Sequence, residues 1–274
     1  MEKAYVSREA LSATDKEDLK RVAVALADAA REAILPLFRS TNLALENKAD
    51  QGFDPVTHAD KAAERAMRAI LEAQRPEDGI LGEEYGETFG SSGLTWVLDP
   101  IDGTRSFMSG TPTWGVLIAL RDAAGPFFGV IDQPYIGERF IGGLGLNTMA
   151  GPLGAAALQT RSTRALKDAL LFSTFPEIGS RAEHASFQAV AKEVKLVRYG
   201  LDCYAYALLA AGQIDLVIEA GLSAYDVQAP IAVIEAAGGV VRNWQGRPAH
   251  DGGQIIAATT PELMAAALPL LQKV

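Results

Sequence analysis

The spacing of apolar residues in the first half of the chain changes from helical to strand-like. Apolar side chains recur every three to four positions over 14–38 and again over 57–74, which predicts two amphipathic helices. Thr14 and Glu17 have the spacing of a capping box at the start of the first helix. We expect these helices to pack against a largely antiparallel sheet. Short apolar runs bounded by turn residues predict its strands at 80–82, 94–98, 113–121, 127–134 and 139–143.

Helical and strand-like segments alternate in the second half. Strands are predicted at 169–173, 196–199, 214–219, 239–243 and 255–259. Helices are predicted at 181–192, 203–211, 226–237 and 261–272. This alternation is typical of an α/β layer with partly parallel pairing. The segment 149–163 marks a change of layer without a linker, so we expect an N-terminal α+β half, 1–150, and a C-terminal α/β half, 151–274, to pack as one unit.

The charge of the chain restricts its partners. A net charge of −9 without a basic cluster disfavours nucleic acid. An acidic protein that handles phosphate needs bound cations, because its own field repels the anion. No apolar stretch approaches the roughly 18 residues of a membrane span, and the charged N-terminus lacks the apolar stretch of a signal peptide. Together with the single cysteine, Cys203, these features predict a cytoplasmic protein without membrane partners.

The motif DPIDGT at 99–104 carries the strongest chemical signal in the chain. It follows the apolar run 94–98, so its two carboxylates, Asp99 and Asp102, can converge at the end of a strand. Gly103 lets the main chain approach a ligand closely, and Thr104 adds a hydroxyl at a predicted helix start, where an anion is favoured. A cation site beside a phosphate site predicts a metal-dependent phosphatase.

Four further carboxylates stand at the ends of predicted elements. Glu83 and Glu84 follow a strand, Asp60 lies in the first turn of a helix, and Asp226 opens another helix. Taken singly, Asp60 and Asp226 could equally be helix caps, and Glu83 with Glu84 could be a solvated turn. No histidine or cysteine is close to them in the sequence. An all-oxygen set of this kind selects Mg²⁺, Mn²⁺ or Ca²⁺ over Zn²⁺.

In this order and at these spacings, Gly82-Glu83-Glu84, the DPIDGT motif and Tyr225-Asp226 resemble the inositol monophosphatase superfamily over about residues 14–272. Residues 104–107 and 225–230 are most similar to its histidinol-phosphate phosphatase branch. Inositol phosphatases typically carry Asn and Trp where this chain has Ser106 and Tyr225. The resemblance implies alternating layers of helices and two sheets, an αβαβα sandwich, and a homodimer.

The resemblance also implies a set of metal ligands. Glu83, Asp99 and the main-chain carbonyl of Ile101 would hold one Mg²⁺, and Glu83 would also touch a third, weaker ion. Asp99, Asp102 and Asp226 would hold a second ion, with Asp99 as the bridge. Two or three ions are therefore expected, and Mn²⁺ could take their place.

Catalytic and phosphate-binding roles follow from the same resemblance. Asp60 and Thr104 would orient the attacking water and help to deprotonate it, with Glu83 as a further catalytic residue. The N–H groups of Gly103 and Thr104 would hold phosphate oxygens. Glu84 would support the site as a neighbour.

Matching of positions points to Asp202 and Glu219 as substrate-binding residues. Asp202 stands where inositol phosphatases tend to have a small residue, and a carboxylate there suits a cationic leaving group such as an amino alcohol that bears an imidazole. The alternative for Asp202 is an exposed loop acid. We therefore expect a Mg²⁺-dependent phosphomonoesterase that acts on L-histidinol phosphate. The alternatives are an inositol-1-monophosphatase, a broad-specificity sugar or polyol phosphatase, and a catalytically silent regulatory or binding protein of the same fold.

Overall fold

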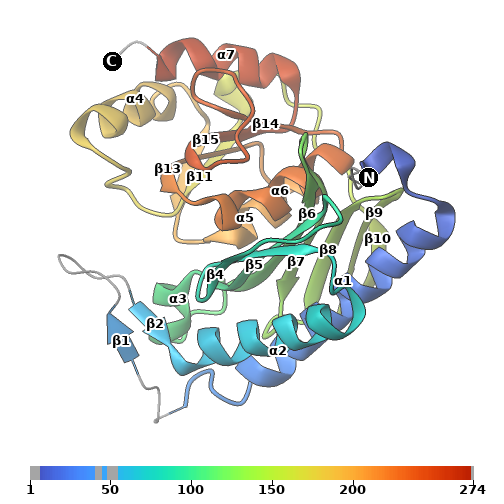
Figure 1. The fold of residues 1–274 in the computed structure, drawn as a ribbon. Coiled ribbons are helices and arrows are strands. Elements are labelled where there is room, and N and C mark those ends of the chain that lie inside the picture. Colours follow the sequence, from blue (N-terminus) through green and yellow to red (C-terminus); the bar gives the residue numbers. More distant parts are fainter. Residues whose placement is uncertain (1–6, 41–44, 48–54, 273–274) are drawn as a thin grey trace.

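Helices and sheets alternate in layers through the molecule (Figure 1). The computed structural model describes residues 7–40, 45–47 and 55–272. Helices α1 (Ala13–Ile34) and α2 (His58–Gln74) cover the outer face of an eight-stranded sheet. Helices α5 (Cys203–Ala210) and α6 (Ala224–Ala236) lie between this sheet and a five-stranded one. Helices α4 (Arg181–Ala191) and α7 (Pro261–Leu271) form the last layer, which confirms the expected αβαβα arrangement.

The eight-stranded sheet is antiparallel except where β3 and β5 run parallel. Its strand order is β10-β9-β8-β7-β6-β5-β3-β4. In chain order the strands are β3 (Gly79–Gly82), β4 (Gly86–Thr88), β5 (Thr95–Asp102), β6 (Gly115–Asp122), β7 (Gly125–Gln133), β8 (Glu138–Gly143), β9 (Leu146–Gly151) and β10 (Gly154–Ala157). The largely antiparallel sheet predicted for the first half is therefore confirmed.

The five-stranded sheet is mixed, as predicted. Strand β11 runs parallel to both β12 and β13, whereas β15 runs antiparallel to β13 and β14. The strands are β11 (Leu170–Ser173), β12 (Leu196–Tyr199), β13 (Leu216–Leu222), β14 (Val240–Asn243) and β15 (Gly253–Ala258). The remaining described elements are the hairpin of β1 (Leu45–Asn47) and β2 (Pro55–Thr57), the short helix α3 (Thr104–Ser109), and the 3-10 turns η1 (Arg8–Ala10) and η2 (Leu166–Asp168).

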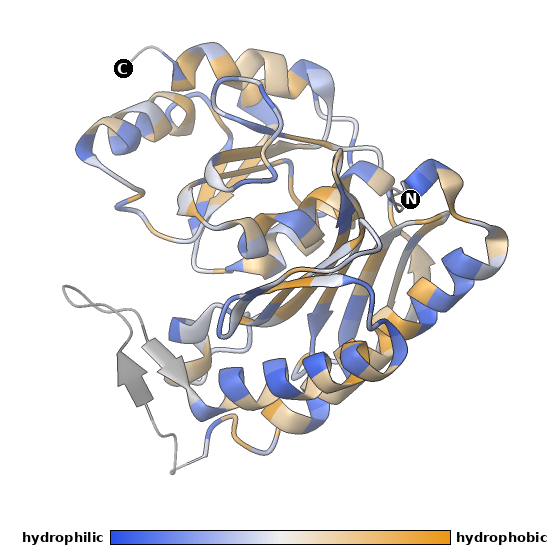
Figure 2. Ribbon diagram, in the orientation of Figure 1, coloured by the Kyte–Doolittle hydropathy of each residue, from blue (hydrophilic) through white to orange (hydrophobic). Residues whose placement is uncertain are grey.

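Each boundary between layers is filled by apolar side chains. One buried cluster lies between α1, α2 and the eight-stranded sheet, a second surrounds α5 and α6, and a third lies under α4 and α7. Figure 2 shows hydrophilic and hydrophobic positions alternating along α1 and α2, whereas the central strands are mostly hydrophobic. Helix α6 is buried over Val227–Ile234 because sheets cover both of its sides. Within the described residues, no helix combines the length and the hydrophobicity that a bilayer span requires.

The sequence misplaced the start of the first helix. Helix α1 begins at Ala13, so its N-cap is Ser12, whose hydroxyl accepts the N–H of Asp15 at 3.1 Å. Asp15 in return accepts the N–H of Ser12 at 2.9 Å, which completes the capping box. Thr14 already lies inside the helix, and Glu17 pairs with Lys20 at 2.8 Å instead. The prediction of a Thr14–Glu17 box was therefore wrong by two positions.

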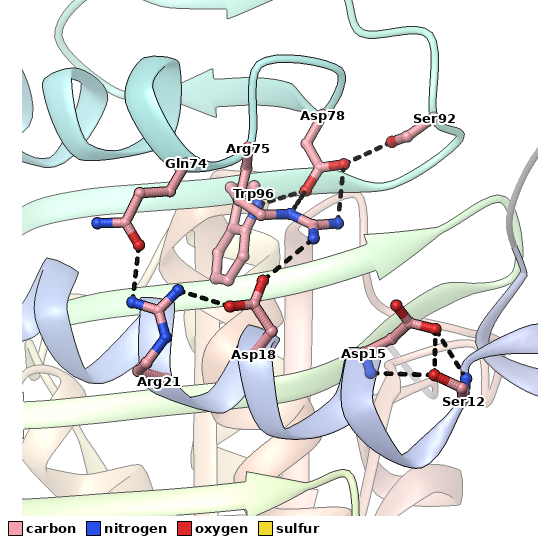
Figure 3. Close-up of polar contacts among 9 residues, drawn as sticks. All are labelled: Ser12, Asp15, Asp18, Arg21, Gln74, Arg75, Asp78, Ser92 and Trp96. Atoms are coloured by element: carbon pink, nitrogen blue, oxygen red, sulfur yellow. Dashed lines mark hydrogen bonds and ion pairs between the residues drawn. The ribbon is translucent and has the colours of Figure 1, made fainter.

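Ion pairs fasten α1 to the turn between α2 and β3 (Figure 3). Arg75 donates to Asp78 at 2.8 Å and to Asp18 of α1 at 3.4 Å. Asp78 is buried and also accepts the indole N–H of Trp96 at 2.9 Å and the hydroxyl of Ser92 at 2.7 Å. Because Trp96 belongs to β5, this cluster fixes the helical layer relative to the strand that carries the DPIDGT motif.

Replacing Asp78 by alanine leaves the buried indole N–H of Trp96 and part of the Arg75 guanidinium without their acceptor. We expect Asp78→Ala to lower the free energy of unfolding by about 1.5–3 kcal/mol. Urea denaturation followed by tryptophan fluorescence measures the change. Asp18→Ala is the matched control, because Asp18 also accepts from Arg75 but is 36% exposed; its cost should stay below about 1 kcal/mol. Equal losses in the two variants would contradict the role of burial.

The pair Arg8–Asp122 makes stability depend on pH. Arg8 donates to both carboxylate oxygens of Asp122, at 2.6 and 2.9 Å, and lowers the pKa of Asp122 from 3.8 to about 2. Between about pH 2 and pH 3.8, the folded protein therefore binds fewer protons than the unfolded chain. The stabilisation is complete above pH 4 and is lost as the pH falls towards 2.

Asp122→Asn lacks this contribution at every pH. The gap in Tm between the parent protein and the variant should be widest above pH 4 and should narrow as the pH approaches 2. Thermal melts followed by circular dichroism over pH 2–6 measure this gap. A gap that stays constant over the whole interval would show that the pair does not couple folding to protonation.

Candidate active site

The DPIDGT motif lies inside the last part of β5. The strand runs to Asp102, further than the apolar run 94–98 indicates, because Asp102 still pairs with Gly115 of β6. Between Asp99 and Asp102 the register shifts, at the place where Pro100 cannot donate to the ladder. The main-chain N–H of Ile101 instead donates to Asp99 Oδ1 at 3.0 Å. This local turn brings the two carboxylates of the motif close together.

Helix α6 brings a third carboxylate to the end of β5. Asp99, Asp102 and Asp226 each offer an oxygen that lies within 4.8 Å of the others, and Asp99 is buried. Asp226 also accepts the N–H of Ser223 at 2.7 Å through Oδ2, so it caps α6 as well. A carboxylate has two oxygens, and the cap and the acidic group are therefore compatible. The cap that the sequence left open for Asp226 is confirmed, and its metal-binding role stays a prediction that its place in the acidic group allows.

Glu83 reaches the same place from the neighbouring strand. Strand β3 lies parallel to β5, and the N–H of Glu83 donates to the carbonyl of Leu98 at 3.2 Å. Glu83 is close enough to Asp99 to raise the pKa of Asp99 through repulsion and a hydrogen bond. Because carboxyl ends of parallel strands meet at one edge, the two motifs predicted from the sequence lie side by side.

A buried glutamate that the sequence did not single out supports this turn. Glu64 of α2 accepts the N–H of Glu84 at 2.7 Å and that of Tyr85 at 3.2 Å. Its carboxylate lies where a side chain on Gly82 would begin, so any larger residue at that position would displace Glu64. Arg68, one helical turn along, donates to Glu64 at 2.8 Å. Glu64 thus fixes the main chain that presents Glu83.

The carboxylates at the end of β5 repel one another. Burial raises the pKa of Asp99 well above its ordinary value, and Glu83, Asp102 and Asp226 raise it further. Burial, Asp226 and Asp202 likewise raise the pKa of Asp102, against the N–H of Cys203, which donates to Asp102 Oδ2 at 2.6 Å. The donor set consists of hard oxygens, so the group could hold a divalent cation such as Mg²⁺ or Mn²⁺.

The end of the motif forms the start of α3. Gly103 has a φ of 85°, in the left-handed region that favours glycine, and it serves as the N-cap of the helix. The hydroxyl of Thr104 donates to the carbonyl of Ile101 at 3.2 Å. Gly103 and Thr104 therefore stand beside Asp102, where the sequence places the phosphate.

A pocket of about 290 Å³ opens beside this group. Asp102, Gly103, Thr104 and Asp226 form one end of its wall, and Phe175, Asp202 and Glu219 are also part of its lining. The pocket brings together residues from both sheets and from α3, α5 and α6. Most of the residues that the sequence predicted for metal, phosphate and substrate therefore surround one space.

Glu219 is a buried carboxylate of β13. It accepts the main-chain N–H of Thr174 at 2.6 Å, the hydroxyl of Thr174 at 2.9 Å and that of Ser173 at 3.3 Å. Burial nevertheless raises its pKa to about 7. The strand ladder is irregular between Glu219 and Leu222, which turns this part of β13 towards the pocket wall.

Asp202 directly precedes α5 and is half-buried. Its carboxylate makes no cap hydrogen bond to the helix, and its Oδ2 instead accepts the hydroxyl of Ser106 at 2.5 Å and that of Thr113 at 3.3 Å. Sequence reasoning named Ser106 only through the family resemblance and did not identify the hydroxyls of Thr113, Ser173 and Thr174. Their signal is weak because serine and threonine are common and their partners are far away in the sequence.

Asp60 and Glu84 occupy different surroundings. Asp60 is buried in the first turn of α2, the helix that packs on β5. Glu84 is half-buried and follows Glu83 in the turn after β3. Neither residue is part of the pocket lining.

Comparisons with known proteins agree on one family. A model described as the inositol monophosphatase family matches residues 15–274. The chain is 44% identical to the bifunctional phosphatase IMPL2, chloroplastic, of Arabidopsis thaliana over 86% of this chain and 67% of that protein. It is 34% identical to a histidinol-phosphatase of Streptomyces coelicolor over 89% and 93%. A solved inositol monophosphatase from Zymomonas mobilis is 40% identical, covers 96% of this chain and 100% of its own, and superposes with a TM-score of 0.81.

Cation binding should relieve the repulsion at the end of β5. We expect Mg²⁺ to raise the Tm, with a stabilisation of about 2.7 kcal/mol when free Mg²⁺ is about 100 times its dissociation constant. Asp99→Asn should raise the Tm of the EDTA-treated protein, because it removes a buried negative charge, and should diminish the shift that Mg²⁺ causes. Thermal-shift titration measures both effects.

Glu17→Gln is the matched control, since Glu17 is an exposed acid of α1 far from the group. It should leave the Mg²⁺ shift intact. An unchanged Tm of the parent protein in Mg²⁺, or a full shift in Asp99→Asn, would contradict the cation site.

Proposed function

The chain belongs to the inositol monophosphatase family of phosphatases, and we propose that it hydrolyses L-histidinol phosphate to L-histidinol and phosphate in a Mg²⁺-dependent reaction. The histidinol-phosphatase that is 34% identical over most of both chains supports this substrate. The observation that carries the proposal is the pocket itself. Beyond Asp102 and Asp226, two more carboxylates line it against a single arginine, Arg105, and this excess of negative charge favours a leaving group that is positively charged.

We propose that Glu83, Asp99, the carbonyl of Ile101, Asp102 and Asp226 hold two to three Mg²⁺ ions, for which Mn²⁺ could substitute. Bound divalent cations lower the pKa of water and neutralise the charge on the leaving oxygen. The repulsion among the carboxylates supports this assignment, because their combined charge is stable at neutral pH only beside cations.

The remaining residues position the reactants. The hydroxyl of Thr104 donates to the carbonyl of Ile101, so its oxygen lone pairs can accept a hydrogen bond from the attacking water and orient it. Asp60 assists in orienting and deprotonating that water. The N–H groups of Gly103 and Thr104 hold the phosphate oxygens, beside the carboxylate of Asp102. Phosphoryl transfer requires chiefly this kind of positioning and charge neutralisation.

The other residues of the pocket suit the leaving alcohol. L-Histidinol carries an ammonium group and an imidazole ring. Asp202 and Glu219 provide two carboxylates for these cationic groups, and Phe175, which is 43% exposed, provides an aromatic face for the ring. A cation beside Glu219 would favour its ionised form, against the burial that raises its pKa to about 7.

An inositol-1-monophosphatase or a broad polyol phosphatase is the second candidate. The 40% identity to the Zymomonas mobilis inositol monophosphatase favours it, and carboxylates also accept hydrogen bonds from ring hydroxyls. A catalytically silent binding protein is disfavoured because every carboxylate that the metal assignment requires is present. The homodimer and the cytoplasmic location stay predictions.

Release of phosphate from L-histidinol phosphate and from inositol 1-phosphate, each with Mg²⁺ or EDTA, tests the proposal. We expect kcat/KM to be at least about tenfold higher for L-histidinol phosphate, which corresponds to about 1.4 kcal/mol of transition-state stabilisation. Activity should vanish in EDTA and in Asp99→Asn, and Glu17→Gln should retain it. Equal activity on the two substrates would overturn the histidinol assignment, and full activity of Asp99→Asn would overturn the metal mechanism.

A further inference from the structure

We propose that Ser106, supported by Thr113, is a positioning residue that selects for a cationic leaving group by aiming the carboxylate of Asp202 into the pocket. The inference rests on the proposed function, which it deepens. Ser106 and Thr113 are not part of the pocket lining, whereas Asp202 is. Both hydroxyls reach the pocket lining through their hydrogen bonds to Asp202.

The main chain at Asp202 is strained. Its φ and ψ of 48° and −141° lie in a region that residues with a side chain rarely adopt. An aspartate at the start of a helix ordinarily accepts an N–H group of the first turn, but this one does not. The Asp202 carboxylate therefore does not bond to the first turn of α5 but to the hydroxyl of a residue that is distant in the sequence.

The distant partner is a chain of two hydroxyls. Ser106 donates to Asp202 Oδ2 at 2.5 Å, since an ionised carboxylate can only accept. The hydroxyl of Thr113 lies 3.2 Å from Ser106 Oγ, 3.3 Å from Asp202 Oδ2 and 3.5 Å from the carbonyl oxygen of Gly200, and its single proton can serve any one of these acceptors. Both hydroxyls approach the same oxygen, so Oδ1 is available to a ligand in the pocket. The two hydroxyls thereby fix the rotation of the carboxyl group.

The same carboxyl group rests against the phosphate segment. A side-chain carbon placed on Gly103 would lie 2.7 Å from Asp202 Cγ, so glycine is needed for this close approach. The following residue, Cys203, donates its N–H to Asp102 at 2.6 Å. The distance between the phosphate end and Asp202 is therefore set by packing. A cationic group on the leaving alcohol meets Asp202 Oδ1 only if Ser106 holds the other oxygen.

The charged neighbours of Asp202 are consistent with one oxygen being held by hydroxyls and the other facing the substrate. Burial raises the pKa of Asp202, and the hydroxyls of Ser106 and Thr113 and the charge of Arg105 oppose this rise. The Arg105 guanidinium lies 5.1 Å from the centre of the Phe175 ring. Glu219 is the other carboxylate of the pocket that remains outside the metal assignment. The guanidinium of Arg105 makes a cation–π contact with Phe175. Asp202 Oδ1 therefore stays accessible to a cationic group of the substrate.

Kinetics on two substrates test the inference. L-Histidinol phosphate has a cationic leaving group, and glycerol 2-phosphate has a neutral one. We expect Ser106→Ala to lower kcat/KM for L-histidinol phosphate about tenfold, mainly through a higher KM, because one hydrogen bond to a charged group is lost. Hydrolysis of glycerol 2-phosphate should change less than about twofold, within the effect of a neutral contact.

Three further variants separate positioning from structure. Ser106→Thr keeps the hydroxyl and should restore the preference for L-histidinol phosphate, and Thr113→Val should reproduce a part of the loss. Ser109→Ala is the matched control, because Ser109 lies on the same short helix and bonds to Ser106 O and Thr111 without reaching Asp202. Its kinetics should equal those of the parent protein.

The outcomes distinguish this inference from the proposed function. If the parent protein shows no preference for L-histidinol phosphate, the proposed function fails and the inference fails with it. If the preference exists and Asp202→Asn abolishes it while Ser106→Ala keeps it, the proposed function stands and the positioning role is overturned. If Ser106→Ala lowers kcat/KM equally for both substrates, Ser106 serves only the structure of α3, which also overturns the inference.

Discussion

The mutual repulsion of buried carboxylates is the constraint on which the site depends. Asp99, Asp102 and Asp226 present oxygens within 4.8 Å of one another, with Glu83 beside them. Taking such groups out of water favours their neutral forms, and close like charges add to this effect. A divalent cation reverses the balance, because it is the largest local charge and prefers carboxylate oxygens. The acidic cluster thus opposes folding in the absence of cations, and a cation held there would offset this cost.

The layered fold holds these carboxylates close together despite their repulsion. The four carboxylates come from the turn after β3, from β5 and from α6, which meet only in the folded protein. Strand β5 is central in its sheet, and α6 is covered by sheets on both sides, so neither can move away to relieve the charge. The hydrogen bonds of Asp78 to Arg75 and to Trp96 of β5 also help to hold this strand in place. Apolar packing around these elements offsets the electrostatic cost.

The sequence revealed the central elements and missed the peripheral ones for one physical reason. Buried helices and strands have apolar periodicity, and nearly all of them were predicted within a few residues. Strands β4 and β10 are exposed along their length and carry no such pattern. The carboxylates of the site were predictable because they stand in the DPIDGT motif and in an order that resembles the family, although acids at helix starts are common as caps. Ser106 was quoted only as part of the family resemblance, since its partner, Asp202, is 96 positions away.

In this pocket, the residues proposed for metal and phosphate binding differ from those proposed to recognise the leaving group. In the proposed function, metal and phosphate binding draw on the combined charge of several carboxylates and of the cations that they would hold. Recognition of a leaving group relies on one oxygen in one orientation, because hydrogen bonds weaken steeply when the angle is poor. Orientation can be fixed by hydroxyls that never touch the substrate, as Ser106 and Thr113 do behind Asp202. A phosphatase of this architecture can therefore change its substrate through residues outside the pocket while its metal site stays the same.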